Sequence, residues 1–462
     1  MIEKYNFTVD LIRSHEYPQL EEQIYLDHAG TTPYPRSLVE SHYKNLVGNL
    51  FGNPHSSGSP SSLATLERVD QIRSKILRHF NTQSQDYTAV FTSNATAALN
   101  LIGSSLDWNN EVKKFWYLEG SHTSVVGLRG LAHESQGNII GAPASDDHKT
   151  SCVTIQHVES YLKEKLLAWP SASKNDIFHS FDDNHLSSSL PFNLFAYPGQ
   201  CNFSGTRYPL EYINALHARK PSSIQNGDLN NQEEWRIILD AASLAMSSPI
   251  DLKQYPADFV VLSFYKLFGF PTGVGAVLIR KGAEKLMHKR FFGGGTVSAV
   301  AVDRNYHRFR NDISAKWEDG TVPFLEIIAL EQGFDFIENT FGGWKVLRDH
   351  TLSLTEYVYN EMKKLKYDSG VNCIKFYSKS SSSKSSNFPD LIYEQGPIVN
   401  FNIMKPDGII ISPSEIQRLA GINNIHLRAG CFCNPGACQK ALKLSAQDII
   451  KNLEVSKKIL KK

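Results

Sequence analysis

The stretch Asp258-Phe-Val-Val-Leu-Ser-Phe-Tyr-Lys-Leu-Phe-Gly269 decides how the rest of the chain is interpreted. Its apolar run is typical of a buried strand and ends at Ser263, just ahead of Lys266. A glycine-rich segment and a second apolar run, 276–279, follow at once. A lysine at the end of a buried strand is costly to keep as a bare charge, and a desolvated lysine is the usual Schiff-base former. We therefore predict that the Lys266 amine is reactive, with a surface lysine in a hairpin loop as the alternative.

The composition is that of an ordinary globular protein. The chain has 462 residues, of which 41% are hydrophobic and 21% charged, and its net charge is +1. Charges are nearly balanced and no basic block occurs, which does not favour a nucleic-acid partner. No apolar stretch is long enough to span a bilayer, and residues 1–7 show no targeting pattern. We expect a soluble, cytoplasmic protein without a membrane partner.

Short apolar runs alternate with helix-like segments, which predicts a mainly parallel sheet covered by helices, an α/β fold. The predicted strands are 88–92, 115–118, 193–197, 237–239, 259–262 and 276–279, and the first is followed by a helix over 95–106. After about residue 330 a long helical pattern at 345–366 and one strand at 397–403 predict a second, smaller domain. Three stretches, 142–150, 217–233 and 378–387, have the composition of insertions or loops, and the last is predicted to be disordered.

Three of the six cysteines lie close together, at Cys431, Cys433 and Cys438. In a reducing compartment such a cluster is more typical of metal binding or catalysis than of structure. With His426 the three could offer four zinc ligands, although their spacing is not the paired C-x-x-C of structural zinc sites.

Four positions at strand ends together suit a phosphorylated, ring-shaped cofactor. The turn 91–96 joins a strand to a helix, where free N–H groups and the Thr96 hydroxyl favour an anion. Asp240 could pair with a pyridine nitrogen, His122 could stack on a flat ring, and Lys266 could bind an aldehyde. Each has an ordinary alternative: a helix N-cap by Ser93 or Asn94, a capping aspartate, a structural histidine and a surface lysine. Their order along the chain fits the logic of pyridoxal phosphate enzymes.

Longer motifs resemble the class V aminotransferase family, within it the cysteine desulfurases, and most of all the amino-terminal, desulfurase-like part of molybdenum cofactor sulfurases. The segments that carry the resemblance span about residues 24–445 and are Tyr25–Pro33, Phe51–His55, Asn202–Pro209, Ser263–Gly273, Phe292–Thr296 and His426–Cys438. The resemblance implies a type I pyridoxal phosphate-dependent transferase fold, with a large domain of about 50–330 around a seven-stranded sheet. Residues 1–49 and 331–462 would form the smaller α+β domain.

The resemblance also implies a role for each matching residue. Lys266 binds the cofactor aldehyde, Asp240 pairs with the pyridinium nitrogen, and His122 stacks on the ring. Asn202 sits beside the ring oxygen. The residues that hold the phosphate are Ala95, Thr96 and Ser263, with Thr321 added if a second subunit of a homodimer contributes.

The persulfide-forming residue is predicted to be Cys433 rather than Cys431, because Arg428 stands five residues before Cys433, as the arginine does before the nucleophile of desulfurases. A nearby arginine would also lower the pKa of the thiol. Gly430 and the Pro435-Gly436 pair suggest a loop that can swing the sulfur towards the ring.

The function implied is transfer of sulfur from L-cysteine to the molybdenum cofactor, or to a protein carrying it, for enzymes of the xanthine dehydrogenase and aldehyde oxidase type. The alternatives are a general cysteine desulfurase, a kynureninase-like enzyme or transaminase, and a non-enzymatic zinc or scaffold protein. Two positions depart from the family pattern, Tyr265 in place of histidine and Ser243 in place of glutamine or histidine. Sulfurases of this kind continue into a β-rich MOSC-type domain. This chain stops at Lys462, so we expect a fragment, a protein that acts alone, or an acceptor domain on a separate polypeptide.

Overall fold

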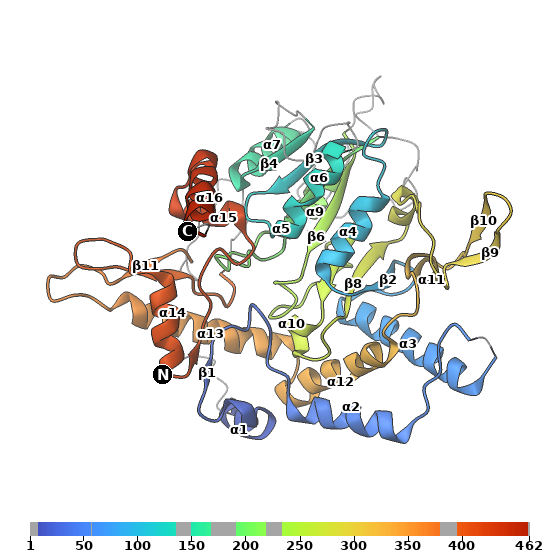
Figure 1. The fold of residues 1–462 in the computed structure, drawn as a ribbon, viewed down its shortest axis with the longest axis horizontal. Coiled ribbons are helices and arrows are strands. Elements are labelled where there is room, and N and C mark those ends of the chain that lie inside the picture. The colour runs from blue at the N-terminus through green and yellow to red at the C-terminus, as the bar shows by residue number, and fades with distance from the viewer. Residues whose placement is uncertain are drawn as a thin grey trace.

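A seven-stranded sheet forms the centre of the computed structural model, which describes residues 8–56, 58–134, 149–167, 191–218, 233–378 and 395–460. The strands lie in the order β2-β8-β7-β6-β5-β3-β4 (Figure 1). Their bounds are β2 Tyr87–Thr92, β3 Val112–Leu118, β4 Thr150–Val153, β5 Phe192–Pro198, β6 Trp235–Asp240, β7 Phe259–Ser263 and β8 Gly275–Arg280. Only β8 runs antiparallel to its neighbours, so the predicted mainly parallel, seven-stranded sheet is confirmed.

Both faces of the sheet are buried, which explains why its central strands are mostly apolar in sequence. Every residue of β5, β6 and β7 is buried. Alternate side chains point to opposite faces, so Phe195 and Ile237 join one core cluster while Leu194 and Ile238 join the other.

Helices cover the two faces and make a three-layer molecule. One face carries α4 (Ala95–Ser105), α5 (Thr123–Val126), α6 (Leu128–Glu134) and α11 (Ile313–Trp317). The other carries α2 (Arg36–Gly48), α3 (Pro60–His79), α7 (Ile155–Leu167), α9 (Glu211–His217) and α12 (Phe324–Phe341). A short helix, α10 (Tyr265–Phe268), joins β7 to β8.

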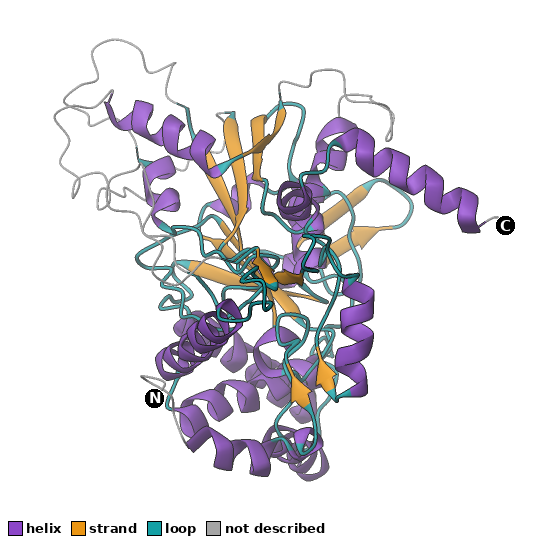
Figure 2. Ribbon diagram, turned by 90° about the vertical axis from the view of Figure 1, so that its left-hand side faces the viewer, coloured by secondary structure: helices purple, strands orange, loops and turns teal. Residues whose placement is uncertain are grey.

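The carboxyl-terminal part of the chain lies beside the carboxyl ends of the parallel strands. Its elements are α13 (Trp344–Lys363), β11 (Ile374–Phe376), β12 (Phe401–Ile403), α14 (Pro413–Ile422), β13 (Ile425–His426), α15 (Pro435–Leu442) and α16 (Ala446–Leu460). The amino-terminal strand β1 (Ile24–Tyr25), which follows α1 (Thr8–Glu16) and η1 (Pro18–Leu20), pairs with β13 in parallel. This pairing joins the amino-terminal segment to the carboxyl-terminal part, and the C-terminal helix α16 projects from the molecule (Figure 2). The remaining elements are η5 (Ala283–Leu286) and the hairpin of β9 (Val297–Ala301) and β10 (Tyr306–Phe309).

The predicted elements are found with small changes. The helix expected over 345–366 spans 344–363, and the strand expected over 397–403 is shortened to 401–403. Lys266 lies in α10, so the expected loop is a helical turn. Most of the three predicted insertions at 142–150, 217–233 and 378–387 falls outside the described residues. Within the described ranges no helix is long and apolar enough to cross a membrane.

Candidate active site

Three of the predicted residues meet because three parallel strands end at the same edge of the sheet. Asp240 is the last residue of β6, Lys266 comes three residues after β7, and His122 follows the end of β3. In open α/β sheets, ligands bind outside the carboxyl ends of the strands. The negative charge of Asp240 acts to raise the pKa of both Lys266 and His122, so the three side chains lie close together.

Lys266 has an altered basicity. Burial is the main cause that lowers its pKa, and the charge of Arg428 adds to this, while Asp240 and Cys433 act in the opposite direction. A lowered pKa favours the neutral amine, which is the form that attacks an aldehyde. The carbonyl oxygen of Lys266 accepts a hydrogen bond of 2.6 Å from the Thr32 hydroxyl, which anchors α10 to the amino-terminal motif 25–33.

His122 lies where the helix α5 begins, and its ring is oriented by that position. Its Nδ1 accepts the main-chain N–H of Ser124 at 3.1 Å, so a neutral ring carries its proton on Nε2. Burial lowers the pKa of His122, and Lys266 adds to this while Asp240 opposes it. The neutral imidazole is therefore favoured, which suits stacking on a flat ring.

Asp240 is a carboxylate with only 7% of its surface exposed. Its Oδ1 accepts the N–H of Ala242 at 3.1 Å. A buried carboxylate needs a compensating partner, and the Asp240 oxygens can accept a further hydrogen bond from a cationic group. Ser243, which stands where the family usually has glutamine or histidine, also has a hydrogen-bond partner. Its hydroxyl accepts a hydrogen bond of 3.1 Å from the side-chain amide of Gln200.

The amino terminus of α4 is the predicted anion-binding end of the site. Asn94 caps the helix by accepting the N–H of Ala97 at 2.9 Å, so the N-cap alternative is correct for this residue. The same helix end also faces Ser263, whose hydroxyl accepts the Ala95 N–H at 2.9 Å. Thr96 adds a hydroxyl 2.8 Å from that of Ser124. Helix N-termini with such hydroxyls favour phosphate groups.

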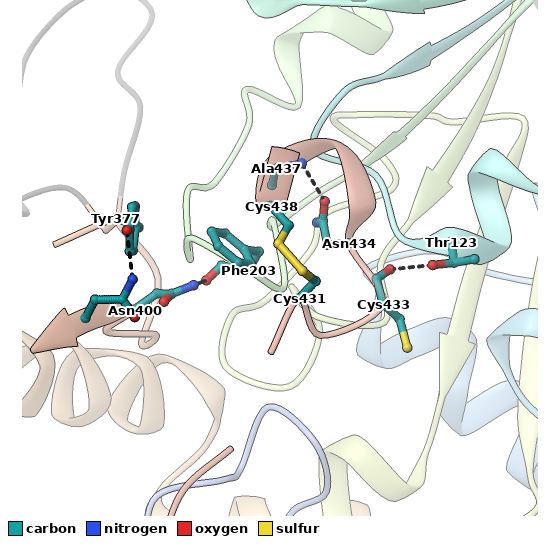
Figure 3. The surroundings of a disulfide bond; sticks show 10 residues. Thr123, Phe203, Tyr377, Asn400, Cys431, Cys433, Asn434, Ala437 and Cys438 are labelled. Atoms are coloured by element: carbon teal, nitrogen blue, oxygen red, sulfur yellow. Dashed lines mark hydrogen bonds between the residues drawn. A yellow bond between two sulfur atoms is a disulfide. The ribbon is translucent and has the colours of Figure 1, made fainter. Parts of the chain in front are cut away.

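The cysteine segment differs from its prediction in one respect. Cys431 and Cys438, with Cα atoms 5.4 Å apart, form a disulfide, and Cys433 remains a free, exposed thiol (Figure 3). The expectation that the whole cluster serves metal binding or catalysis is therefore wrong for these two, because a tight turn brings their Cβ atoms together. His426 hydrogen bonds to Gln23 at 2.7 Å, and no group of three metal-ligating side chains occurs in the described parts of the chain. The four-ligand zinc arrangement is not assembled.

Arg428 and Asn202 contact the cysteine segment rather than each other. Arg428 forms an ion pair with Asp27, and its guanidinium lies 5.1 Å from the ring centroid of Phe432. Its predicted effect on the thiol of Cys433 stays a prediction. Asn202 donates a hydrogen bond of 2.6 Å to the Phe432 carbonyl.

Thr321 takes part in a different contact from those of the other predicted residues. It is exposed, and its hydroxyl accepts a hydrogen bond of 3.4 Å from Asn53. Sequence reasoning missed Asp27, Thr123 and Asn434, all of which contact predicted residues. Asp27 and Asn434 had a signal, since they lie in the motifs 25–33 and 426–438, whereas Thr123 had none.

Comparison with known proteins supports the family that the sequence motifs indicate. A family model described as aminotransferase class V matches residues 24–169 and 225–443. Molybdenum cofactor sulfurases of Bos taurus, Homo sapiens and Arabidopsis thaliana are 38%, 39% and 36% identical over 97%, 96% and 96% of this chain. The aligned part is 47%, 46% and 52% of those proteins, so the chain spans about half the length of the curated relatives it matches.

Solved structures of two cysteine desulfurases and of the cystine C-S lyase C-DES share the fold. The apo enzyme of Thermococcus onnurineus NA1 has a TM-score of 0.65 at 17% identity and covers 98% of both chains. The Escherichia coli enzyme CsdA has a TM-score of 0.66 at 17% identity and covers 94% of this chain and 91% of its own. A third structure, a C-DES mutant with glycine covalently linked to its pyridoxal phosphate cofactor, has a TM-score of 0.62 at 14% identity and covers 93% and 98% of the two chains. The predicted type I transferase fold is confirmed.

Proposed function

Because the chain belongs to the class V aminotransferase family, we propose that it uses pyridoxal 5'-phosphate to take sulfur from L-cysteine. Alanine leaves, the sulfur remains as a persulfide on Cys433, and the molybdenum cofactor or a protein carrying it receives the sulfur. The observation that carries this proposal is that Asp240 and a free cysteine, Cys433, both lie close enough to Lys266 to affect its pKa. A transaminase or a kynureninase-like hydrolase has no need for a thiol at that place.

The residues present fit the cofactor at three points. The end of α4, with Ala95, Thr96 and Ser263, suits a phosphate group. Asp240 is a buried carboxylate that suits a protonated ring nitrogen, and Lys266 is an amine whose pKa is lowered by burial. When bound, the cofactor supplies an electron sink for negative charge at the substrate α-carbon.

The chain's own residues account for the remaining steps. Lys266, as a neutral amine, can take the proton from the substrate α-carbon. The Cys433 thiol must lose its proton before it attacks the substrate sulfur. A sulfur–sulfur bond then forms and the substrate carbon–sulfur bond breaks, and its electron pair stays with the carbon, which takes up a proton to become the methyl group of alanine. His122 holds a proton on Nε2 beside these groups.

The acceptor, the subunit state and the compartment belong to the same proposal. Similarity to molybdenum cofactor sulfurases along nearly the whole chain supports the molybdenum cofactor, whereas a general cysteine desulfurase with another acceptor is the second candidate, supported by the shared fold. The exposed position of Thr321 is compatible with a homodimer in which it serves the partner's phosphate site. A reaction that depends on the free Cys433 thiol supports the cytoplasm, whereas the Cys431–Cys438 disulfide is more typical of an oxidising compartment.

The test is to trap the cofactor and to follow the sulfur. Borohydride reduction and peptide mapping should find a pyridoxyl label on Lys266, and Lys266→Ala should give a colourless, inactive protein. L-cysteine should yield alanine, and the persulfide should reactivate a desulfo molybdenum enzyme. No label on Lys266 would refute the cofactor assignment. Alanine without reactivation would favour the general desulfurase, and no alanine would refute sulfur transfer.

A further inference from the structure

The main chain around the free cysteine has an unusual conformation. Phe432 and Cys433 both have positive φ angles, 53° and 55°. This left-handed region is unfavourable for residues with a Cβ atom, and it persists only where the surroundings impose it. Two such residues in succession, one of them the proposed nucleophile, require an explanation in the contacts around them.

Both carbonyl groups of this pair are held by side chains from distant parts of the sequence. The Cys433 carbonyl accepts two hydrogen bonds from Thr123, at 2.7 Å from its main-chain N–H and at 2.9 Å from its hydroxyl (Figure 3). The Phe432 carbonyl accepts the side-chain amide of Asn202 at 2.6 Å. These bonds fix the peptide groups on both sides of the Cys433 Cα atom.

Asn434, the next residue, ties the segment to the same neighbours. It is fully buried, and its side-chain amide donates to the Gly120 carbonyl at 2.8 Å and to the Asn202 Oδ1 at 2.9 Å. Its Oδ1 accepts the N–H of Ala437 at 3.1 Å and so caps α15. We call Thr123, Asn202 and Asn434 the cysteine clamp.

The clamp joins the cysteine segment to the loop that carries His122. Thr123 follows His122 directly, and both residues take part in the start of α5. An ion pair of 2.6 Å between Lys440 and Glu119 fastens the far side of the segment to the same loop. In Figure 3 the Cys433 sulfur points away from the disulfide, so the thiol is free while its main chain is held.

We propose that Thr123 and Asn434 are positioning residues that hold the Cys433 main chain against the His122 loop. The Cys433 Cα atom then stays fixed relative to the substrate, and the thiol reaches the substrate by rotation of the Cys433 side chain alone. This view replaces the swinging loop expected from Gly430 and Pro435-Gly436. The positioning role of Thr123 and Asn434 rests on the proposed function. It also implies that the sulfur acceptor must approach the exposed Cys433.

Two variants weaken the clamp without touching the thiol. Thr123→Val removes one of the two donors to the Cys433 carbonyl and keeps the shape of the side chain. Asn434→Ser can still cap α15 but is too short to reach Gly120 and Asn202. Thr123→Ser keeps the hydroxyl and is the conservative comparison. Thr355→Val is the matched control, because among the described residues the Thr355 hydroxyl bonds only within α13, to the Thr351 carbonyl at 2.7 Å.

Amide hydrogen exchange of the peptide 428–438, with and without pyridoxal phosphate, gives a readout that needs no activity. We expect exchange about tenfold faster in Thr123→Val and Asn434→Ser, the effect of one lost net hydrogen bond, and wild-type exchange in the other two. With L-cysteine, kcat should fall about tenfold while KM changes less than twofold, since orientation rather than binding is lost. Thermal melting separates a global folding defect from this local effect, and Thr123→Val tests the proposal if Asn434→Ser does not fold.

The outcomes separate this proposal from the function on which it rests. Wild-type exchange in both clamp variants would overturn it, and so would faster exchange with an unchanged kcat. A wild-type protein that releases no alanine would refute the proposed function and the catalytic half of this proposal, while the exchange data would still decide whether the clamp holds the segment.

Discussion

A negative charge on the Cys433 sulfur would raise the pKa of the Lys266 amine, although 167 positions separate the two residues in the chain. The spacing from Arg428 selected Cys433 over Cys431, and the structure leaves Cys433 as the free thiol of the three. The spacing could not show that Arg428 pairs with Asp27, because an ion pair between the two ends of the chain depends on the β1–β13 pairing. Thr123 and Asn434 carry no chemical signature of their own, so only the folded chain reveals their contacts.

Removing the thiol should separate cofactor binding from sulfur transfer. We expect Cys433→Ala to retain the absorbance of the bound cofactor, because Lys266, Asp240 and the α4 end are untouched, and to lose persulfide formation by at least 1000-fold, on the order of a lost nucleophile. Visible spectra and persulfide-specific labelling would measure the two effects. Cys152→Ala, which removes another exposed free thiol, should change neither. Persulfide formed at a normal rate by the Cys433 variant would assign the nucleophile elsewhere.

At the scale of elements, short apolar runs were sufficient to predict the central strands, because β5, β6 and β7 are buried on both faces. The strand β8 was also visible as the run 276–279, but its antiparallel direction was not. That direction follows from the tight connection through α10, which returns the chain beside β7. The turn also places Gly275 against the start of α4, where a side chain has no room.

Gly275 is predicted to be essential for the anion-binding end of the site. A Cβ atom at this position would lie 2.6 Å from the Asn94 Cα and 2.6 Å from the Leu262 carbonyl oxygen, both of them main-chain atoms that cannot rotate away. Gly275→Ala should therefore lower the free energy of unfolding by about 1–3 kcal/mol and weaken cofactor retention by displacing α4. Chemical denaturation and cofactor titration would measure both. Gly421→Ala, in the helix α14 with open space around it, should not destabilise the protein. Equal stability of the two variants would contradict the steric argument.

At the scale of the whole molecule, the helical layer α3–α12 connects the sheet to α13 in the carboxyl-terminal part. The contact is aromatic, and at its centre lies His79, the last residue of α3. Its ring centroid is 4.7 Å from that of Phe80, 5.1 Å from Phe334 and 4.9 Å from Trp344. The sequence could not predict this cluster, because His79 looks like an ordinary basic residue at a helix end. Long-range packing alone gives it an apolar environment.

This environment makes the stability of the protein depend on pH. Burial lowers the pKa of His79 from 6.5 to about 4, and its Nε2 has no hydrogen-bond partner among the described residues. Between these values the unfolded chain binds a proton that the folded chain does not, so the stability is complete above pH 6.5 and declines as the pH falls towards 4. His79→Phe should remove this share of the decline, about 1–3 kcal/mol between pH 7 and 4. Denaturation midpoints of both proteins across this range would measure it. His157→Phe, at an exposed histidine that forms no ion pair among the described residues, is the control and should leave the decline unchanged. Parallel curves for the wild-type and His79→Phe proteins would show that the histidine ring is protonated as readily in the folded state as in the unfolded chain.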